Sequence, residues 1–427
     1  MAITIIIVMK RVRKEKGYLV LLALSLFLIE ETVRIGLSSV LFVERDIDSM
    51  KKSLVLNPGD AEISFRLARV YHMLMLVDEK KAEALYVKSL ELNPLLSSSW
   101  LGLAELFTDN GERLKALTVL NRVEELAPLY IARLWETSIL ALRLGAQSMA
   151  IKNLRIVAKV DPQRRMRVFD VCWQLFNDPD LILNEVIADE VLPDYLRYLI
   201  TRNKPEDTFP VWKRMEKSGM VSDDIAFNYI EFLIRKDRSA EAFSIWDELF
   251  GGSKNDSLFW NGGFENEPLG RGFDWQIGKV DGVSIDFDWR KKFKGTKSLR
   301  LEFDGKHNVD FSHVSQVIPI EPDRDYLLTS YIATQGITTR NGISWDVYCY
   351  PKGNMTKSTE PLTETTDWKR VELPFHTPSD CKSVVVRLRR YKSEKLDRYI
   401  SGTAWVDDVK LLKVETNTNA ESREKGI

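Results

Sequence analysis

The sequence predicts a multidomain α + β protein with an N-terminal membrane-anchor helix, an α-solenoid of paired helices and a C-terminal all-β sandwich. Three observations predict this fold class. A basic segment precedes an apolar run, prolines recur at a spacing near 34 residues, and the hydrophobic pattern changes from helical to alternating after Phe250. A chain of 427 residues is too long for one hydrophobic core, so two or three domains are expected.

The N-terminal segment has the residue order of a signal peptide or a signal anchor. Its basic residues, which are Lys10, Arg11, Arg13, Lys14 and Lys16, precede an apolar run from Tyr18 to Ile29. A membrane span needs about 20 residues, so a span has to continue to Val43 and include Glu30, Glu31 and Arg34. The spacing of Glu30 and Arg34 predicts an ion pair on one helix face. We favour an uncleaved anchor; a cleaved signal peptide and a buried soluble helix remain alternatives.

A repeat follows this segment. Its markers are Pro58, Pro94, Pro128 and Pro162, which are 36, 34 and 34 residues apart. When the blocks are aligned on these prolines, the apolar pattern of each block predicts two amphipathic helices. Small residues lie where the two helices are expected to cross, namely Ala68, Ala82, Ala104, Ala116, Ser138 and Ala150. Residues 97–128 also have Trp100, Leu103, Phe107, Leu120 and Val123 in the matching positions. The blocks resemble the tetratricopeptide repeat, which implies a stacked solenoid that binds protein partners.

Residues 163–250 keep a helical pattern but lose these signature residues, so we expect degenerate repeats that continue the solenoid. Trp173, Trp212 and Trp246 are expected to be core residues of these helices. The glycines that follow Phe250 predict a linker before the next domain.

The C-terminal part shows short alternating segments at 298–303, 314–320, 326–333, 344–350, 369–375, 383–390 and 404–412, separated by turn residues. This pattern predicts an antiparallel β-sandwich. Its opening Asn-Gly-Gly-Phe-Glu, from Asn261, and its closing Trp-Val-Asp-Asp-Val, from Trp405, resemble jelly-roll carbohydrate-binding modules of the galactose-binding-like type. The resemblance covers residues 257–414 and implies a structural calcium ion and a sugar site.

For calcium, the resemblance implies Glu265 and Asp407 as carboxylate ligands, since calcium prefers oxygen ligands. The alternative is that these carboxylates are exposed or bonded to turns. Cys349 and Cys381 lie in the same domain and form a disulfide if the domain is exported; free buried thiols are the alternative.

For the sugar site, aromatic rings suit the apolar faces of pyranoses and arginines suit hydroxyls or acidic sugars. The candidates are Tyr348, Tyr350, Trp289, Trp345, Trp368, Arg340, Arg387 and Arg389. Strand alternation places Trp345 on one face and Asp346, Tyr348 and Tyr350 on the other, which is the more polar face. Each aromatic candidate has core packing as its alternative. Trp275 and Trp405 are expected in the core.

The predicted domains are residues 1–45 for the basic flank and anchor, 46–162 for regular repeats, 163–250 for degenerate repeats, 251–256 for the linker, 257–414 for the sandwich and 415–427 for a disordered tail. A net charge of −1 argues against nucleic acid as a partner. Three cysteines exclude a four-cysteine zinc site, and common catalytic motifs are missing from the sequence.

These features predict a non-catalytic, membrane-anchored scaffold. The solenoid is expected to bind protein partners on its concave face, and the sandwich a polysaccharide or oligosaccharide. The N-terminus is expected in the cytoplasm and the remainder in the periplasm or outside the cell, because basic flanks stay cytoplasmic. This domain combination suggests bacterial exopolysaccharide or cell-envelope glycan synthesis or export. One alternative is a pure protein–protein assembly scaffold whose sandwich does not bind sugar. Another is an enzyme with a glycosidase-like sandwich that carries a carboxylate pair.

Overall fold

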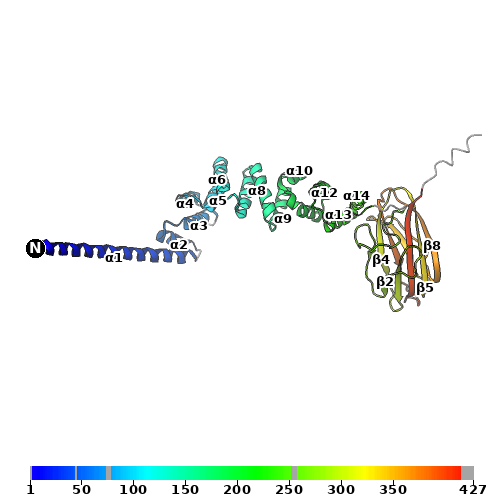
Figure 1. The fold of residues 1–427 in the computed structure, drawn as a ribbon. Helices are drawn as coiled ribbons and strands as arrows, with labels where there is room; N and C mark the ends of the chain where they lie inside the picture. The colour runs from blue at the N-terminus through cyan, green and yellow to red at the C-terminus, as the bar shows by residue number, and fades with distance from the viewer. Residues whose placement is uncertain (1, 44–45, 74–77, 252–256, 415–427) are drawn as a thin grey trace, which may run out of the picture. The chain divides into compact units, whose positions relative to one another are not determined.

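The computed structural model describes residues 2–43, 46–73, 78–251 and 257–414, with side chains from residue 18 onward (Figure 1). The predicted disordered tail, most of the predicted linker and the side chains of the basic flank lie outside the described residues. The chain divides into two compact units, Met1–Tyr198 and Leu199–Ile427. The division falls within helix α11 (Leu192–Thr201) and not at the glycine-rich linker.

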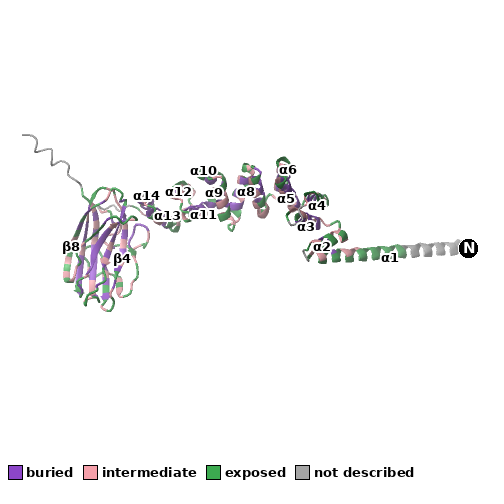
Figure 2. Ribbon diagram, turned by 180° about the vertical axis from the view of Figure 1, so that it is seen from behind, coloured by how far each residue is buried: buried purple, intermediate pink, exposed green. Residues whose placement is uncertain are grey.

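Helix α1 (Ala2–Val43) is uninterrupted, and its C-terminal part packs against α2 (Ile47–Leu56). Near its C-terminal end, Ser38 Oγ donates to the Ser53 carbonyl of α2 at 2.9 Å, and Ser53 Oγ donates back to the Ser38 carbonyl at 2.8 Å. Figure 2 shows that the described part of α1 before this contact is mostly exposed. Arg34 pairs with Glu31 at 2.5 Å, so the expected pairing with Glu30 is wrong. Within the described side chains, no helix has an apolar stretch that meets the length and charge requirements of a bilayer span.

Three regular helix pairs follow, and they confirm the predicted repeat. They are α3 (Ala61–Met73) with α4 (Glu79–Leu92), α5 (Ser97–Asp109) with α6 (Arg113–Leu126), and α7 (Ile131–Arg143) with α8 (Gln147–Val160). All six small residues predicted at the helix crossings are fully buried. Each of the four repeat prolines directly follows the C-cap residue of a second helix, because proline cannot continue a helix.

The next segment is less regular, as its degenerate pattern predicts. It contains α9 (Arg165–Leu175), α10 (Pro179–Leu181), a π-helical turn η1 (Ile182–Val186), a 3₁₀ turn η2 (Asp189–Val191) and α11. Trp173 in α9 is half-buried, so it contributes less to the core than expected.

The second unit begins with the end of α11 and more helices, namely η3 (Pro205–Asp207), α12 (Thr208–Lys217), α13 (Asp223–Arg235) and α14 (Ser239–Phe250). Trp212 and Trp246 are fully buried, as expected. The sandwich follows from residue 257.

Two five-stranded antiparallel sheets form the sandwich. Sheet A has the order β1 (Gln276–Ile277), β4 (Phe311–Pro319), β9 (Ser383–Arg390), β6 (Ser344–Cys349) and β7 (Thr356–Ser358). Sheet B has the order β2 (Val283–Asp288), β3 (Ser298–Asp304), β10 (Ser401–Lys413), β5 (Asp325–Ile337) and β8 (Glu364–His376). All seven segments predicted from alternation form strands, whereas β1, β2 and β7 were not predicted.

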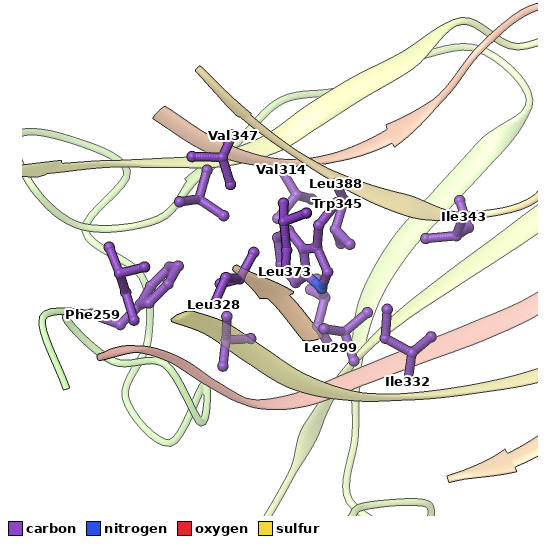
Figure 3. Packing of buried hydrophobic residues seen from close by; sticks show 14 of the residues in the cluster. Phe259, Leu299, Val314, Leu328, Ile332, Ile343, Trp345, Val347, Leu373 and Leu388 are labelled. Atoms are coloured by element: carbon purple, nitrogen blue, oxygen red, sulfur yellow. The ribbon is translucent and has the colours of Figure 1, made fainter. Parts of the chain in front are cut away.

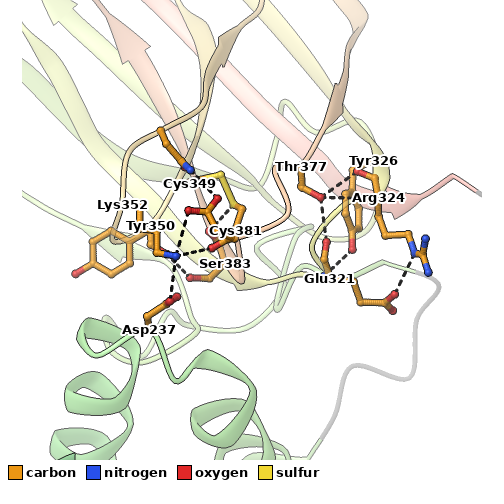
Figure 4. The surroundings of a disulfide bond; sticks show 12 residues. Asp237, Glu321, Arg324, Tyr326, Cys349, Tyr350, Lys352, Thr377, Cys381 and Ser383 are labelled. Carbon is orange, nitrogen blue, oxygen red and sulfur yellow. Dashed lines mark hydrogen bonds and ion pairs between the residues drawn. A yellow bond between two sulfur atoms is a disulfide. The ribbon is translucent and has the colours of Figure 1, made fainter.

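The sandwich core lies between the two sheets and is built from alternate residues of the longer strands (Figure 3). Trp345 lies in this core with no exposed surface, and its indole Nε1 donates to Ser330 Oγ of the facing sheet at 2.7 Å. Trp275 is also in the core, as expected. Trp405 is buried, as expected, but it lies beneath Lys291 and outside the cluster between the sheets. Cys349 and Cys381 form a disulfide (Figure 4).

In the second unit, helices α13 and α14 pack directly on the sandwich. Trp246 of α14 lies edge-on to Trp260 and Phe273, with ring centroids 5.4 and 5.9 Å away. Gly272 makes this contact possible, because a Cβ at that position would lie 2.4 Å from the Trp246 ring. Arg271 donates to Glu231 of α13 at 3.0 Å. Aromatic packing and an ion pair therefore join these helices to the sandwich.

Candidate carbohydrate-binding site

The outer face of sheet A gathers polar and aromatic side chains. Alternation along β9 sends Val384, Val386 and Leu388 into the core, so Arg387 and Arg389 face outward. Alternation along β6 likewise sends Asp346 and Tyr348 outward. The strand register places Asp346 opposite Arg387. The sequence prediction that Tyr348 and Asp346 share a face opposite Trp345 is therefore confirmed.

Asp346 is at the centre of a buried polar network on this face. Its side chain has no exposed surface and accepts hydrogen bonds from Arg387 Nη2 at 3.2 Å, Tyr391 OH at 2.8 Å and Ser358 Oγ at 2.8 Å. Arg389 Nε lies 3.9 Å from the same carboxylate. A buried charge needs partners of this kind, because removal from water is costly. The network thus holds two arginines in fixed positions beside the surface.

The arginines of the network lie over tyrosine rings. The Arg387 guanidinium carbon is 4.8 Å from the centre of the Tyr348 ring, and that of Arg389 is 3.9 Å from the centre of the Tyr391 ring. The Nε atoms of both arginines are buried without a hydrogen-bond partner among the described residues. Burial raises the pKa of Tyr348, although Arg387 opposes this, so its hydroxyl stays protonated at neutral pH.

A pocket of about 400 Å³ adjoins this network at one end of the strands. The sheet and the segments next to it supply Tyr348, Tyr350, Gln276 and Ser315. The opposite wall comes from helix α13. Figure 4 shows the turn after α13 below the β6 end of sheet A, where Lys352 Nζ lies 3.7 Å from Asp237 Oδ2.

The structure brings together only part of the predicted sugar site. Tyr348, Tyr350, Arg387 and Arg389 lie on or beside the outer face of sheet A. Trp345 is excluded because its ring is buried between the sheets. Arg340 lies in the exposed β5–β6 loop, where its backbone N–H bonds to Asp397.

The remaining two predicted residues belong to sheet B. Trp289 directly follows β2 and is 64% exposed, and Trp368 lies in β8. The Trp368 ring lies 6.0 Å from that of Phe293, which stacks on Tyr331. Trp368 therefore belongs to an aromatic cluster with Phe293 and Tyr331 on sheet B, separate from the network on sheet A.

Sequence reasoning did not select several residues of the sheet A site. Alternation already places Asp346 on the face of Tyr348, although it was not selected as a site residue, and Tyr391 continues the alternation of β9 just beyond the end of that strand. No local signal connects α13 to the sheet, because its residues lie in another part of the chain.

The two predicted calcium ligands share a second pocket, of about 680 Å³. Asp407 is fully buried and accepts from the backbone N–H groups of Phe293 and Lys294 at 2.8 and 3.0 Å. Burial raises the pKa of Asp407 despite these bonds. Burial also acts on Glu265, but bonds from Thr296 outweigh it and hold the pKa of Glu265 below its usual value.

These residues fit an oxygen-ligated cation in part. A Cβ on Gly263 would lie 4.0 Å from both Asp407 Oδ1 and Glu265 Oε1, so both carboxylates lie near Gly263. Calcium takes six to eight oxygen ligands. Among the described side chains, no group of three or more His, Cys, Asp or Glu is placed to hold a metal ion. Backbone carbonyls and water would have to complete the ligand set.

Comparisons with known proteins give structural similarity alone. No family model and no curated protein match the chain. Among solved structures, the chain is 14% identical to part of tailspike protein 4 of bacteriophage CBA120, over 37% of this chain and 21% of that one, with a TM-score of 0.27. The chain thus spans about a fifth of that relative's length.

Two further solved structures match larger shares of their own chains. A family 16 carbohydrate-binding module is 21% identical, over 37% of this chain and 99% of that one, with a TM-score of 0.26. YrrB, a tetratricopeptide-repeat protein, is 14% identical, over 48% of this chain and 91% of that one, with a TM-score of 0.24. Solved structures similar to this chain therefore include both kinds of protein that its sequence resembles.

Proposed function

We propose that this protein is a non-catalytic scaffold that binds a polysaccharide through the outer face of sheet A and protein partners through its helical repeats. The observation that supports sugar binding is the buried Asp346 network, which fixes Arg387 and Arg389 over tyrosine rings at a surface pocket. Rigid aromatic rings beside fixed polar groups suit the two kinds of surface that a sugar presents.

Replacing Tyr348 by alanine tests this proposal. The variant should bind its polysaccharide about 30-fold more weakly, because truncating an aromatic residue at the centre of a binding surface costs about 2 kcal/mol. Affinity electrophoresis of the full chain against xylan, β-glucan, galactan and polygalacturonate measures the effect. Circular dichroism checks that the variant remains folded.

Trp289→Ala is the matched control, because it removes an exposed aromatic residue next to the other sheet. If Trp289→Ala weakens binding and Tyr348→Ala does not, the site belongs to sheet B. Binding to none of the polymers favours the alternative function, a pure assembly scaffold.

For protein partners, the supporting feature is a polar row across three successive pairs. Asp109 of α5 accepts from Arg143 of α7 at 2.5 Å and lies 3.0 Å from His72 Nε2 of α3. Asp109 and Arg143 are about half exposed. A peptide that crosses the first helices of these pairs would meet both charges.

We also propose that α1 anchors the protein to a membrane, with the repeats and sandwich outside the cytoplasm. Two observations support this location. Large apolar side chains from Tyr18 to Ile29 are exposed, and the sandwich contains a disulfide, a bond typical of oxidising compartments. We expect the protein to stay in the membrane fraction after alkaline carbonate extraction. Recovery in the soluble fraction would contradict the anchor.

We propose that the protein acts in exopolysaccharide or cell-envelope glycan synthesis or export.

We propose a structural calcium ion at Glu265 and Asp407. The ion would offset the cost of a buried carboxylate at Asp407. Millimolar calcium should therefore raise the melting temperature of the full chain by several degrees relative to the same protein in chelator, and Asp407→Asn should abolish the increase. An equal increase with Asp407→Asn would rule out this site.

A further inference from the structure

Helix α13 forms one wall of the pocket beside the sugar-binding face. Glu231, Ile234 and Arg235 line the pocket from the helix, and Tyr348 and Tyr350 line it from the sandwich. The helix is held there by the Arg271–Glu231 ion pair and the packing of Trp246 on Phe273. The pocket is therefore a feature of the docked helices and sandwich together, and neither element forms it alone.

Two charged side chains line the pocket, Glu231 and Arg235, and of these only Glu231 has an ion-pair partner among the described residues. Glu231 has a counter-ion, since Arg271 Nε lies 3.0 Å from its carboxylate. Arg235 is exposed, lines the pocket and makes no ion pair with any residue that the structure describes. The other lining residues are neutral. A ligand in this pocket thus meets the Glu231 carboxylate, which is paired with Arg271, and the Arg235 guanidinium, which has no ion-pair partner among the described residues.

We propose that this pocket is a subsite for a carboxylate-bearing sugar unit, with Arg235 as the partner of the carboxylate and the two tyrosines as partners of the ring. A guanidinium binds a carboxylate through two parallel hydrogen bonds, which gives both strength and orientation. The volume of about 400 Å³ falls within the usual range for ligand pockets. This inference rests on the proposed function and adds the chemical class of the glycan.

The test compares two polymers that differ in charge, polygalacturonate and its carboxyl-reduced form, with the full chain. The natural protein should prefer polygalacturonate. Arg235→Gln should weaken binding to polygalacturonate by about tenfold or more and leave binding to the reduced polymer unchanged. Lys236→Gln removes the same charge one residue further along, outside the pocket lining, and should bind as the natural protein does.

Tyr348→Ala distinguishes a failure of the acidic subsite from a failure of the proposed function. If it weakens binding to both polymers and Arg235→Gln weakens neither, the acidic subsite is wrong and the sugar-binding face remains. If Tyr348→Ala changes neither affinity, the proposed function itself is wrong. A natural protein that binds the reduced polymer as well as or better than polygalacturonate, or that binds neither, overturns the acidic subsite.

Discussion

Replacing Trp246 by alanine should lower the free energy of unfolding of the second unit by about 3–5 kcal/mol, because it leaves a large cavity in a packed contact. Trp246 is fully buried and its ring packs against Phe250 of its own helix and Trp260 and Phe273 of the sandwich. Urea denaturation of the full chain, followed by hydrogen exchange of peptides from α13 to β4, measures the loss.

Two variants make this prediction specific. Trp246→Phe keeps an apolar ring and removes an indole N–H that is buried without a partner, so it should cost clearly less than alanine. Trp289→Ala, at a side chain that is 64% exposed, should change stability by no more than about 0.5 kcal/mol. Equal stability of Trp246→Ala and the natural protein would show that the helices do not dock on the sandwich as described.

Replacing Asp346 by alanine should destabilise the sandwich by about 3–5 kcal/mol and abolish glycan binding. The substitution leaves Arg387 without its carboxylate partner and Tyr391 without its acceptor. Without this anion, the nearby Arg389 retains its ion pair with Asp310. Thermal denaturation and affinity electrophoresis of the same variant measure the two effects.

Asp346→Asn should fall between the natural protein and Asp346→Ala, because an amide oxygen still accepts hydrogen bonds but does not balance the arginine charge. Asp367→Ala is the control, since Asp367 is exposed on β8. If Asp346→Ala is as stable as Asp367→Ala and binds glycan normally, the network has no role in the site.

Local periodicity predicted the secondary structure of this protein well. Ala104 and Ala116 were expected at a helix crossing because only small side chains allow close approach, and both are fully buried. Alternation also correctly placed the side chains of Trp345 and Tyr348 on opposite faces of their sheet. The short strands β1 and β7 were not predicted, since two or three residues show no measurable period.

The candidate site was predicted only in part, for a physical reason. Alternation tells which residues of one strand share a face, but it does not tell which strands form the same sheet. Trp368 was therefore grouped with Tyr348, although β8 and β6 belong to different sheets. Arg235 was not selected at all, because the pocket brings it together with Tyr348 of β6, more than 100 positions further along the sequence.

The continuity of α1 has a mechanical consequence. The apolar segment around Leu24 and Ser38, which is hydrogen-bonded to Ser53 of α2, belong to one uninterrupted helix. Each residue of an α-helix turns about 100° and rises 1.5 Å. One alanine inserted after Arg34 would therefore rotate the first repeat by about 100° relative to the apolar segment. The number of residues between the apolar segment and Ser38 therefore sets the orientation of that repeat about the helix axis.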